Sequence, residues 1–184
     1  MDTDGILMAR SVQGHPDAFV AVAQRHGVAI HGYLARRAGR QVADDLLADV
    51  WVRAFAARGG YDSSYDDARP WLYGIARNVL RAHWRSAQNA ALAGPEPTVD
   101  PWDDIVDRLD SAASGEALIS AVRRLPPAER EVLLLVAWEQ LTPSEAAGVL
   151  GVPAGTARSR LHRARATLRR VLAAASRETD EVST

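Results

Sequence analysis

LTPSEAAGVLGVPAGTARSRLHRARATLRR, residues Leu141–Arg170, is the stretch of this sequence that decides its fold. Thr142 and Glu145 predict a capping box at the start of a short helix, in which side chains satisfy backbone N–H groups that have no partner inside the helix. Gly151 can adopt the left-handed conformation that ends a helix, and Pro153 keeps the first helix from continuing through the turn.

A second helix is predicted to start near Ala154 or Gly155. Its apolar residues recur at helical spacing, which predicts one packed face and leaves the others free for arginines. The arginines are Arg158, Arg160, Arg163, Arg165, Arg169 and Arg170. A solvated amphipathic helix is the alternative interpretation. The cap, the turn and the apolar register in one window instead favour a helix-turn-helix that places its second helix in a DNA groove.

The composition is that of a soluble globular protein. Of 184 residues, 47% are hydrophobic and 24% charged. The sequence has no apolar run of about 18 residues, which predicts no membrane span and favours a cytoplasmic location. It also has no cysteine, which excludes disulfides and thiolate metal sites.

The net charge of −1 hides a strongly uneven distribution, and all 22 basic residues are arginine. Residues 1–94 and 113–177 are net positive, whereas residues 95–112 hold one arginine and six acidic residues. Ala87–Asp110 is also rich in Ala, Gly and Pro, which predicts a linker. Trp102 is unusual in such a segment, and its partner cannot be read from the sequence.

Three helices are predicted before the linker, over Asp17–Arg37, Asp44–Arg58 and Pro70–Arg85, with a polar loop at Gly59–Arg69. The fold class is therefore all-α. In the second helix, acidic residues and an arginine stand at four-residue steps: Asp45, Asp49 and Arg53. A surface ion pair and a docking site for a basic partner are both open interpretations.

The third helix carries an aromatic and arginine stripe, Tyr73, Arg77, Arg81 and Arg85. Beside a polar loop, such a stripe suits single-stranded nucleic acid, because rings stack on bases and guanidinium groups follow phosphates. Spacing alone favours the simpler interpretation, a basic surface stripe with the tyrosine half buried.

Catalytic and metal-site patterns are not found. The five histidines lack ligand spacing, and there is no nucleophile motif or Gly-rich phosphate loop. His26 and His31 are interpreted as helix-surface groups or satisfied core groups. We therefore expect no enzyme activity, no cofactor and no metal.

Two sets of residues closely resemble one protein family. The first is DDLLADVWVRAF with RPWLYGIARN (Asp44–Phe55 and Arg69–Asn78), and the second is LPPAEREVLLL (Leu125–Leu135) with Leu141–Arg170. They resemble the extracytoplasmic-function (ECF) group of the sigma-70 family, the small promoter-specificity subunits of bacterial RNA polymerase. The resemblance covers about Asp17–Arg85 and Glu116–Leu172.

The resemblance implies two small helical domains joined by a flexible linker. Region 2 would span residues 1–86, the linker 87–112, region 4 residues 113–176 and a tail 177–184. Such a protein is a non-catalytic subunit. It binds core polymerase, recognises the −10 and −35 promoter elements and helps to melt the promoter.

The family's functional residues can be transferred to matching positions. Docking on the β′ clamp helices would use Asp45, Leu46, Asp49, Val50 and Arg53. Holding the melted −10 strand would use Tyr65, Tyr73, Arg77, Asn78 and Arg81. In the −35 duplex, Arg158, Ser159 and His162 would read base edges, while Thr156, Arg160 and Arg163 would hold phosphates.

Two further partners follow from the same resemblance: the β flap of the polymerase and an anti-sigma factor, which holds many relatives inactive. The chief alternative is a free-standing helix-turn-helix repressor with an N-terminal dimerisation or sensor domain. A repressor predicts DNA binding without polymerase, and it leaves Asp45, Asp49 and the stripe at Tyr73–Arg85 unexplained.

Overall fold

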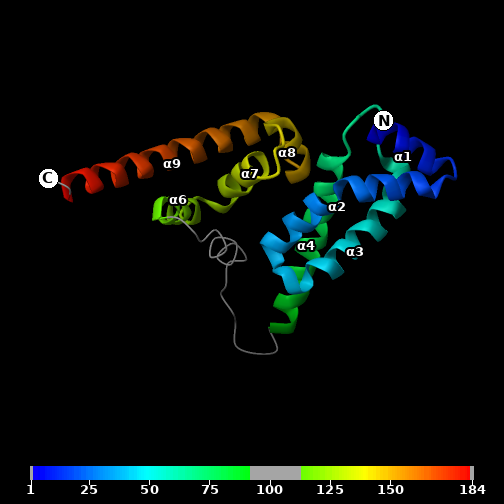
Figure 1. Ribbon diagram of the computed structural model, residues 1–184, viewed down its shortest axis with the longest axis horizontal. Helices are drawn as coiled ribbons and strands as arrows, with labels where there is room; N and C mark the ends of the chain where they lie inside the picture. Colours follow the sequence, from blue (N-terminus) through cyan, green and yellow to red (C-terminus); the bar gives the residue numbers. More distant parts are fainter. Residues whose placement is uncertain (1, 92–112, 183–184) are drawn as a thin grey trace. The chain divides into compact units, whose positions relative to one another are not determined.

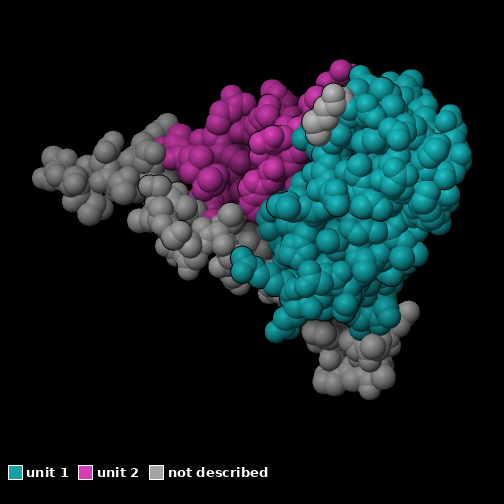
Figure 2. Space-filling view, turned by 45° about the vertical axis from the view of Figure 1, so that its right-hand side comes forward, with its two compact units in different colours: residues 1–99 teal, residues 100–184 magenta. Residues whose placement is uncertain are grey.

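The computed structural model describes residues 2–91 and 113–182, with side chains for 2–88 and 118–174. The chain divides into two compact units, residues 1–99 and 100–184, coloured separately in Figure 2. Every regular element within the described residues is a helix, which confirms the all-α prediction. Trp102 and most of the predicted linker lie outside the described residues.

Unit 1 is a bundle built around one long helix, α2 (Figure 1). This helix contacts α1, α3 and α4. The elements are α1 (Asp4–Val12), α2 (Pro16–Ala38), α3 (Arg40–Ala57), the short 3-10 helix η1 (Arg58–Gly60) and α4 (Arg69–Ala91).

The core of unit 1 centres on two aromatic rings from different helices. Tyr33 of α2 and Tyr73 of α4 are both 2% exposed, and their rings meet edge to face with centroids 5.2 Å apart. Edge-to-face geometry places the positive edge of one ring against the negative face of the other. The guanidinium of Arg37 lies over the Tyr33 ring, 3.7 Å from its centroid.

The helix boundaries of unit 1 differ from those predicted at three places. Helix α1 was not predicted at all. Helix α3 begins at Arg40 rather than Asp44, because Gly39, with φ 90°, is by itself the break after α2. Helix α4 continues to Ala91, so residues expected in the linker are helical; Ala and Gln are good helix formers.

Unit 2 is a helix-turn-helix with two supporting helices. Its elements are α6 (Ala113–Arg123), α7 (Pro127–Ala137), α8 (Pro143–Leu150) and α9 (Ala154–Val182). Helix α9 contacts the other three, and its inward residues Ala157, Leu161 and Ala164 are buried. Helix α9 also extends into the tail predicted at 177–184.

The predicted capping box and turn are confirmed. The Glu145 backbone N–H donates to Thr142 Oγ1 at 3.2 Å, and the Thr142 N–H donates to Glu145 Oε2 at 2.7 Å. Gly151 has the left-handed conformation, with φ 67° and ψ 37°. These local signals place α9 immediately after the turn.

Candidate nucleic-acid interface and partner surfaces

The first turns of α9 present a polar surface. Arg158, Ser159 and His162 are all exposed, and they lie on the side opposite the buried Ala157 and Leu161. The Ser159 hydroxyl donates to the Gly155 carbonyl at 2.9 Å, and its oxygen can still accept a hydrogen bond. The exposed residues Arg158, His162, Arg165 and Arg169 continue along one stripe, because side chains three and four residues apart share a helix face.

The residues expected at phosphates lie at the edges of this surface. Thr156 and Arg160 are half-buried. Arg163 is exposed, and its Nε donates to Glu129 Oε1 of α7 at 2.7 Å. This pair fixes the guanidinium on α7, and the terminal nitrogens carry further donors for a phosphate.

Helix α4 has a buried face and a polar face. Leu72, Ala76 and Leu80 are buried. On the outer face, exposed residues recur at three- and four-residue steps: Asn78, Arg81, Arg85 and Gln88. Arg77 is half-buried beside them.

The position of Tyr73 corrects the predicted stripe. This residue is 2% exposed, because its ring packs on Tyr33 in the core, so it cannot stack on a base in this structure. Its four-residue spacing from Arg77 suggested a shared surface. The apolar neighbours of Tyr73 instead draw it inward.

The loop before α4 is well ordered by its own side chains. The Tyr61 hydroxyl donates to the Tyr65 carbonyl at 2.7 Å, and the Tyr61 ring meets Trp71 edge to face at 5.4 Å. The Ser64 N–H donates to Asp62 Oδ1 at 3.0 Å. The Tyr65 side chain projects outward from this frame, and the residue is 65% exposed.

Ionisation within the loop follows from these contacts. Burial, followed by the negative charges of Asp4 and Asp67, raises the pKa of Tyr61 to about 12, so the phenol keeps its proton to higher pH than an ordinary tyrosine. Hydrogen bonds from the Ser64 side chain and backbone lower the pKa of Asp62. Burial opposes ionisation of Asp67, but hydrogen bonds from Arg69 outweigh it, so the pKa of Asp67 lies below its ordinary value.

Of the α3 residues expected to dock on a partner, some are exposed and others are buried. Asp45, Asp49 and Arg53 are exposed, and Arg53 Nη2 lies 3.5 Å from Asp49 Oδ2. Leu46 is 7% exposed and Val50 is fully buried, which corrects their assignment to a docking surface. Both pack inside unit 1. Val52, 69% exposed, supplies the outward apolar group that the sequence analysis missed.

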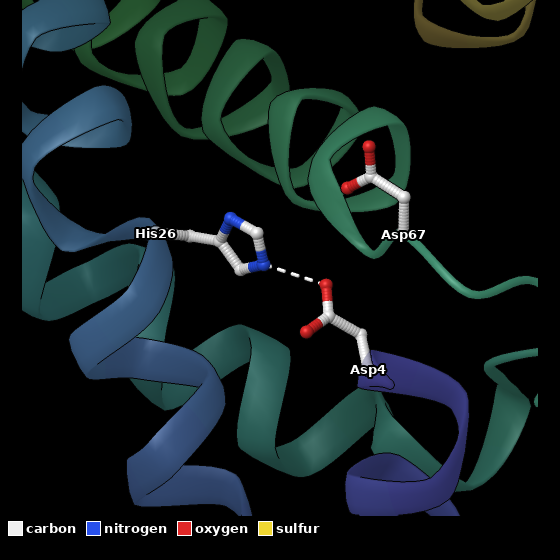
Figure 3. Close-up of side chains that lie close together, drawn as sticks. All are labelled: Asp4, His26 and Asp67. Carbon is white, nitrogen blue, oxygen red and sulfur yellow. Dashed lines mark hydrogen bonds and ion pairs between the residues drawn. The ribbon is translucent and has the colours of Figure 1, made fainter. Parts of the chain in front are cut away.

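A buried charged cluster was also missed. Asp4 is 1% exposed, and its Oδ2 lies 2.6 Å from Nε2 of His26 (Figure 3). Asp4 also pairs with Arg25 and accepts from the Ala68 N–H at 2.8 Å. The position of Asp4 just after Thr3, a helix N-cap, was the signal in the sequence that could have revealed an ordered α1.

Asp4, His26 and Asp67 bring their potential ligand atoms within 4.8 Å of one another (Figure 3). The carboxylates already have partners, because Asp4 pairs with Arg25 and Asp67 with Arg69 at 2.7 Å. Two guanidinium groups thus supply the positive charge that a metal ion would bring. The interpretation of His26 as a satisfied core residue is confirmed.

In the part of the chain that the structure describes, no helix combines the length and the apolar character needed to cross a membrane. Unit 2 defines the class of the protein, because a capped short helix, a left-handed glycine turn and an exposed arginine-rich helix form a helix-turn-helix DNA-binding module. Unit 1 adds a second polar surface on α4 and an acidic one on α3.

Comparison with known proteins identifies the family. Residues 22–90 match the model for "Sigma-70 region 2", and residues 115–168 match "Sigma-70, region 4". The chain belongs to the sigma-70 family, as a member of its ECF group. Its function is promoter-specific transcription initiation.

Three relatives illustrate the match. The RNA polymerase sigma factor CarQ of Myxococcus xanthus is 32% identical over 167 residues, covering 90% of this chain and 95% of CarQ. The ECF sigma factor BldN of Streptomyces coelicolor is 30% identical over 90% of this chain, which spans 64% of the length of BldN.

The solved structure of CnrH in complex with the cytosolic domain of CnrY matches this chain with a TM-score of 0.65. Its sequence identity is 30%, and the match covers 94% of this chain and 99% of CnrH. CnrH is a sigma factor of Cupriavidus metallidurans.

Proposed function

We propose that unit 2 reads the −35 element as duplex DNA, with the start of α9 in the major groove. The observation that carries this proposal is the exposure of Arg158, Ser159 and His162 directly after the capped turn. An arginine can donate to O6 and N7 of guanine together, which discriminates against other bases by about 1–3 kcal/mol. Thr156, Arg160 and Arg163 would contact phosphates, which add affinity and register.

Unit 1 is proposed to hold the melted −10 strand on the loop at residues 61–69 and the outer face of α4. Tyr65 offers an exposed ring for stacking, Asn78 an amide for a base edge, and Arg77 and Arg81 positive charge for the backbone. Strand opening then requires no chemical step, because binding of the extruded bases stabilises the open form. The buried Tyr73 supports this surface from beneath.

The outer face of α3 is proposed to dock on the β′ clamp helices of core polymerase. Asp45 and Asp49 provide negative charge, Arg53 pairs with Asp49, and the exposed Val52 offers an apolar contact beside them. Charge complementarity of this kind contributes to both the association rate and specificity. The later arginines of α9 are proposed to face the β flap. A protein with these partners would work in the cytoplasm.

The test is transcription from a randomised promoter library by core polymerase with and without this protein. We expect transcripts that depend on the protein and share two elements. Arg158→Ala should then relax base preference at one −35 position. Arg169→Ala is the matched control for base preference, since it removes the same charge about 16 Å further along the helix, where the side chain is proposed to face the flap rather than the DNA. It should leave base preference unchanged, whatever its effect on transcript yield.

Two outcomes would contradict this assignment. Unchanged base preference in Arg158→Ala would remove this residue from the readout. Tight, sequence-specific duplex binding without any polymerase binding would favour the repressor alternative.

We also propose a protein inhibitor of the anti-sigma type, because CnrH, which this chain resembles, was solved in complex with the cytosolic domain of CnrY. The proposal is tested by purifying the tagged protein from its native cells and adding any co-purifying protein to the transcription assay. A partner that blocks core binding supports it. A partner that leaves transcription unchanged contradicts it.

A further inference from the structure

Helix α1 lies directly against the loop that is proposed to hold the −10 strand. The Asp4 backbone N–H donates to the Asp66 carbonyl at 3.1 Å. The Asp4 carboxylate accepts from the Ala68 N–H at 2.8 Å, at the point where the loop enters α4. Both contacts join residues more than 60 positions apart, so the loop's shape depends on a distant segment.

Gly5 brings the two backbones into close approach. A Cβ atom at this position would come within 3.0 Å of the backbone oxygens of Ser63 and Tyr65. Those atoms belong to the main chain, so they cannot move aside as the end of a flexible side chain could. A larger residue at position 5 must therefore displace α1 or the loop.

The Asp4 carboxylate anchors this junction to the rest of unit 1. It pairs with His26 of α2 (Figure 3). It also pairs with Arg25 of the same helix and accepts from the Ala68 N–H. Asp4 and His26 are 1% and 6% exposed. A charge-assisted hydrogen bond in such a site is strong, and a missing partner would leave buried donors unsatisfied.

The loop is also held by one of its own residues, Tyr61, whose hydroxyl donates to the Tyr65 carbonyl. The backbone at Tyr65 is thus held between Tyr61 and Gly5, while the Tyr65 side chain projects outward and the residue is 65% exposed. A loop that is ordered before binding does not lose that conformational entropy on binding.

We propose that α1 is a brace for the −10 loop, and that Asp4 and Gly5 are positioning residues for −10 recognition. Neither residue contacts DNA in this proposal. They set the backbone from which Tyr65 reaches the strand. The inference rests on the proposed role of the loop, and the experiment below separates failure of the brace from failure of that role.

The experiment uses holoenzyme and fork-junction DNA whose single-stranded −10 segment carries the sequence selected from the promoter library. Gly5→Ala should reduce discrimination between this DNA and the same DNA with −10 bases replaced. The expected loss of discrimination is about five- to thirty-fold. This corresponds to the conformational entropy lost when one additional backbone residue becomes ordered on DNA binding. Gly27→Ala is the matched control, because a Cβ there meets nothing within 4 Å. It should leave discrimination unchanged.

A conservative series at Asp4 tests the same role without adding bulk. Asp4→Asn keeps an acceptor for the Ala68 N–H, so it should retain more discrimination than Asp4→Ala. Core affinity and −35 preference, measured on the same samples, should remain at wild-type values. Loss of all three properties together would show that α1 only stabilises unit 1, which would overturn the proposal.

Tyr65→Ala separates the two levels of inference. If it leaves −10 discrimination intact, the proposed role of the loop fails. If it lowers discrimination but Gly5→Ala does not, the loop reads DNA and the brace fails. When both single changes lower it, the double variant should lose less than the product of the two effects, because positioning matters only while Tyr65 is present. If the effects of Gly5→Ala and Tyr65→Ala simply multiply in the double variant, Gly5 does not act through Tyr65, which would contradict the positioning role.

Discussion

Two substitutions on α3, three residues apart, should have opposite consequences. Leu46 is 7% exposed and packs in unit 1, so Leu46→Ala should lower the free energy of unfolding by about 2–5 kcal/mol. In a unit of this size, 1 kcal/mol shifts Tm by about 4–8 °C. The Tm of unit 1 should therefore fall by about 8 °C or more, while the folded fraction still binds polymerase normally.

Asp49→Arg should leave stability nearly unchanged and weaken polymerase binding. The Asp49 carboxylate is 58% exposed, and its pair with Arg53 at 3.5 Å is an exposed i,i+4 pair. Such pairs contribute about 0.3–0.5 kcal/mol to stability. At an acidic docking patch, however, reversing the charge creates repulsion, and we expect a loss in affinity of about ten- to a hundred-fold.

Urea unfolding followed by circular dichroism measures the stability of both variants, and fluorescence anisotropy of the labelled protein measures core polymerase affinity. Gln24→Arg, which adds positive charge to an exposed position of α2, is the control. Full affinity in Asp49→Arg would refute the docking assignment. Reduced affinity of well-folded, fully stable Leu46→Ala would refute its assignment to the core.

Three further outcomes are expected. Thr142→Ala removes the hydroxyl that accepts from the Glu145 N–H, and it should lower the stability of unit 2 by about 0.5–2 kcal/mol in thermal melting. Thr142→Ser keeps the hydroxyl and should lose far less stability. Equal losses in the two variants would contradict the capping role. Arg163→Ala should weaken duplex binding for all sequences alike and reduce the salt dependence by about 0.9 in log–log slope; a change confined to one base position would instead make Arg163 a reader. Because the folded-state pKa of Tyr61 is raised from 10.0 to about 12, its contribution to stability is present below pH 10 and is lost as pH rises toward 12. Unfolding followed across this range should show that loss in the wild type and not in Tyr61→Phe, and identical profiles would contradict the assignment.

The helix-turn-helix could be predicted closely because its signals are local. The cap at Thr142 and Glu145, the glycine at 151 and the proline at 153 each act within a few residues of their own position. Nothing from elsewhere in the chain is needed to end one helix and start the next. The exposed arginines of α9 then follow from the positions of its buried residues.

The faces of α3 and α4 were harder to predict because family position and spacing do not determine burial. Leu46 and Val50 neighbour the acidic residues in sequence but point into the core. Tyr73 lies on the same four-residue step as Arg77, yet its ring packs on Tyr33. An amphipathic ring can satisfy either environment, so only the packed structure shows which one it occupies.

The two proposed DNA-reading surfaces differ in how they are supported. In unit 2 the proposed reader is a helix, whose backbone hydrogen bonds are largely satisfied within the helix itself, so a turn and the packing of its buried face on the other helices position it. In unit 1 the proposed reader is a loop, whose backbone groups need partners from elsewhere; Asp4 donates to Asp66 and accepts from Ala68, and Tyr61 donates to Tyr65. These partners come partly from a helix more than 60 residues away, which explains why local patterns could reveal one reader and not the supports of the other. It follows that −10 recognition should be sensitive to substitutions far from the DNA surface, whereas −35 recognition should depend chiefly on the exposed residues of α9.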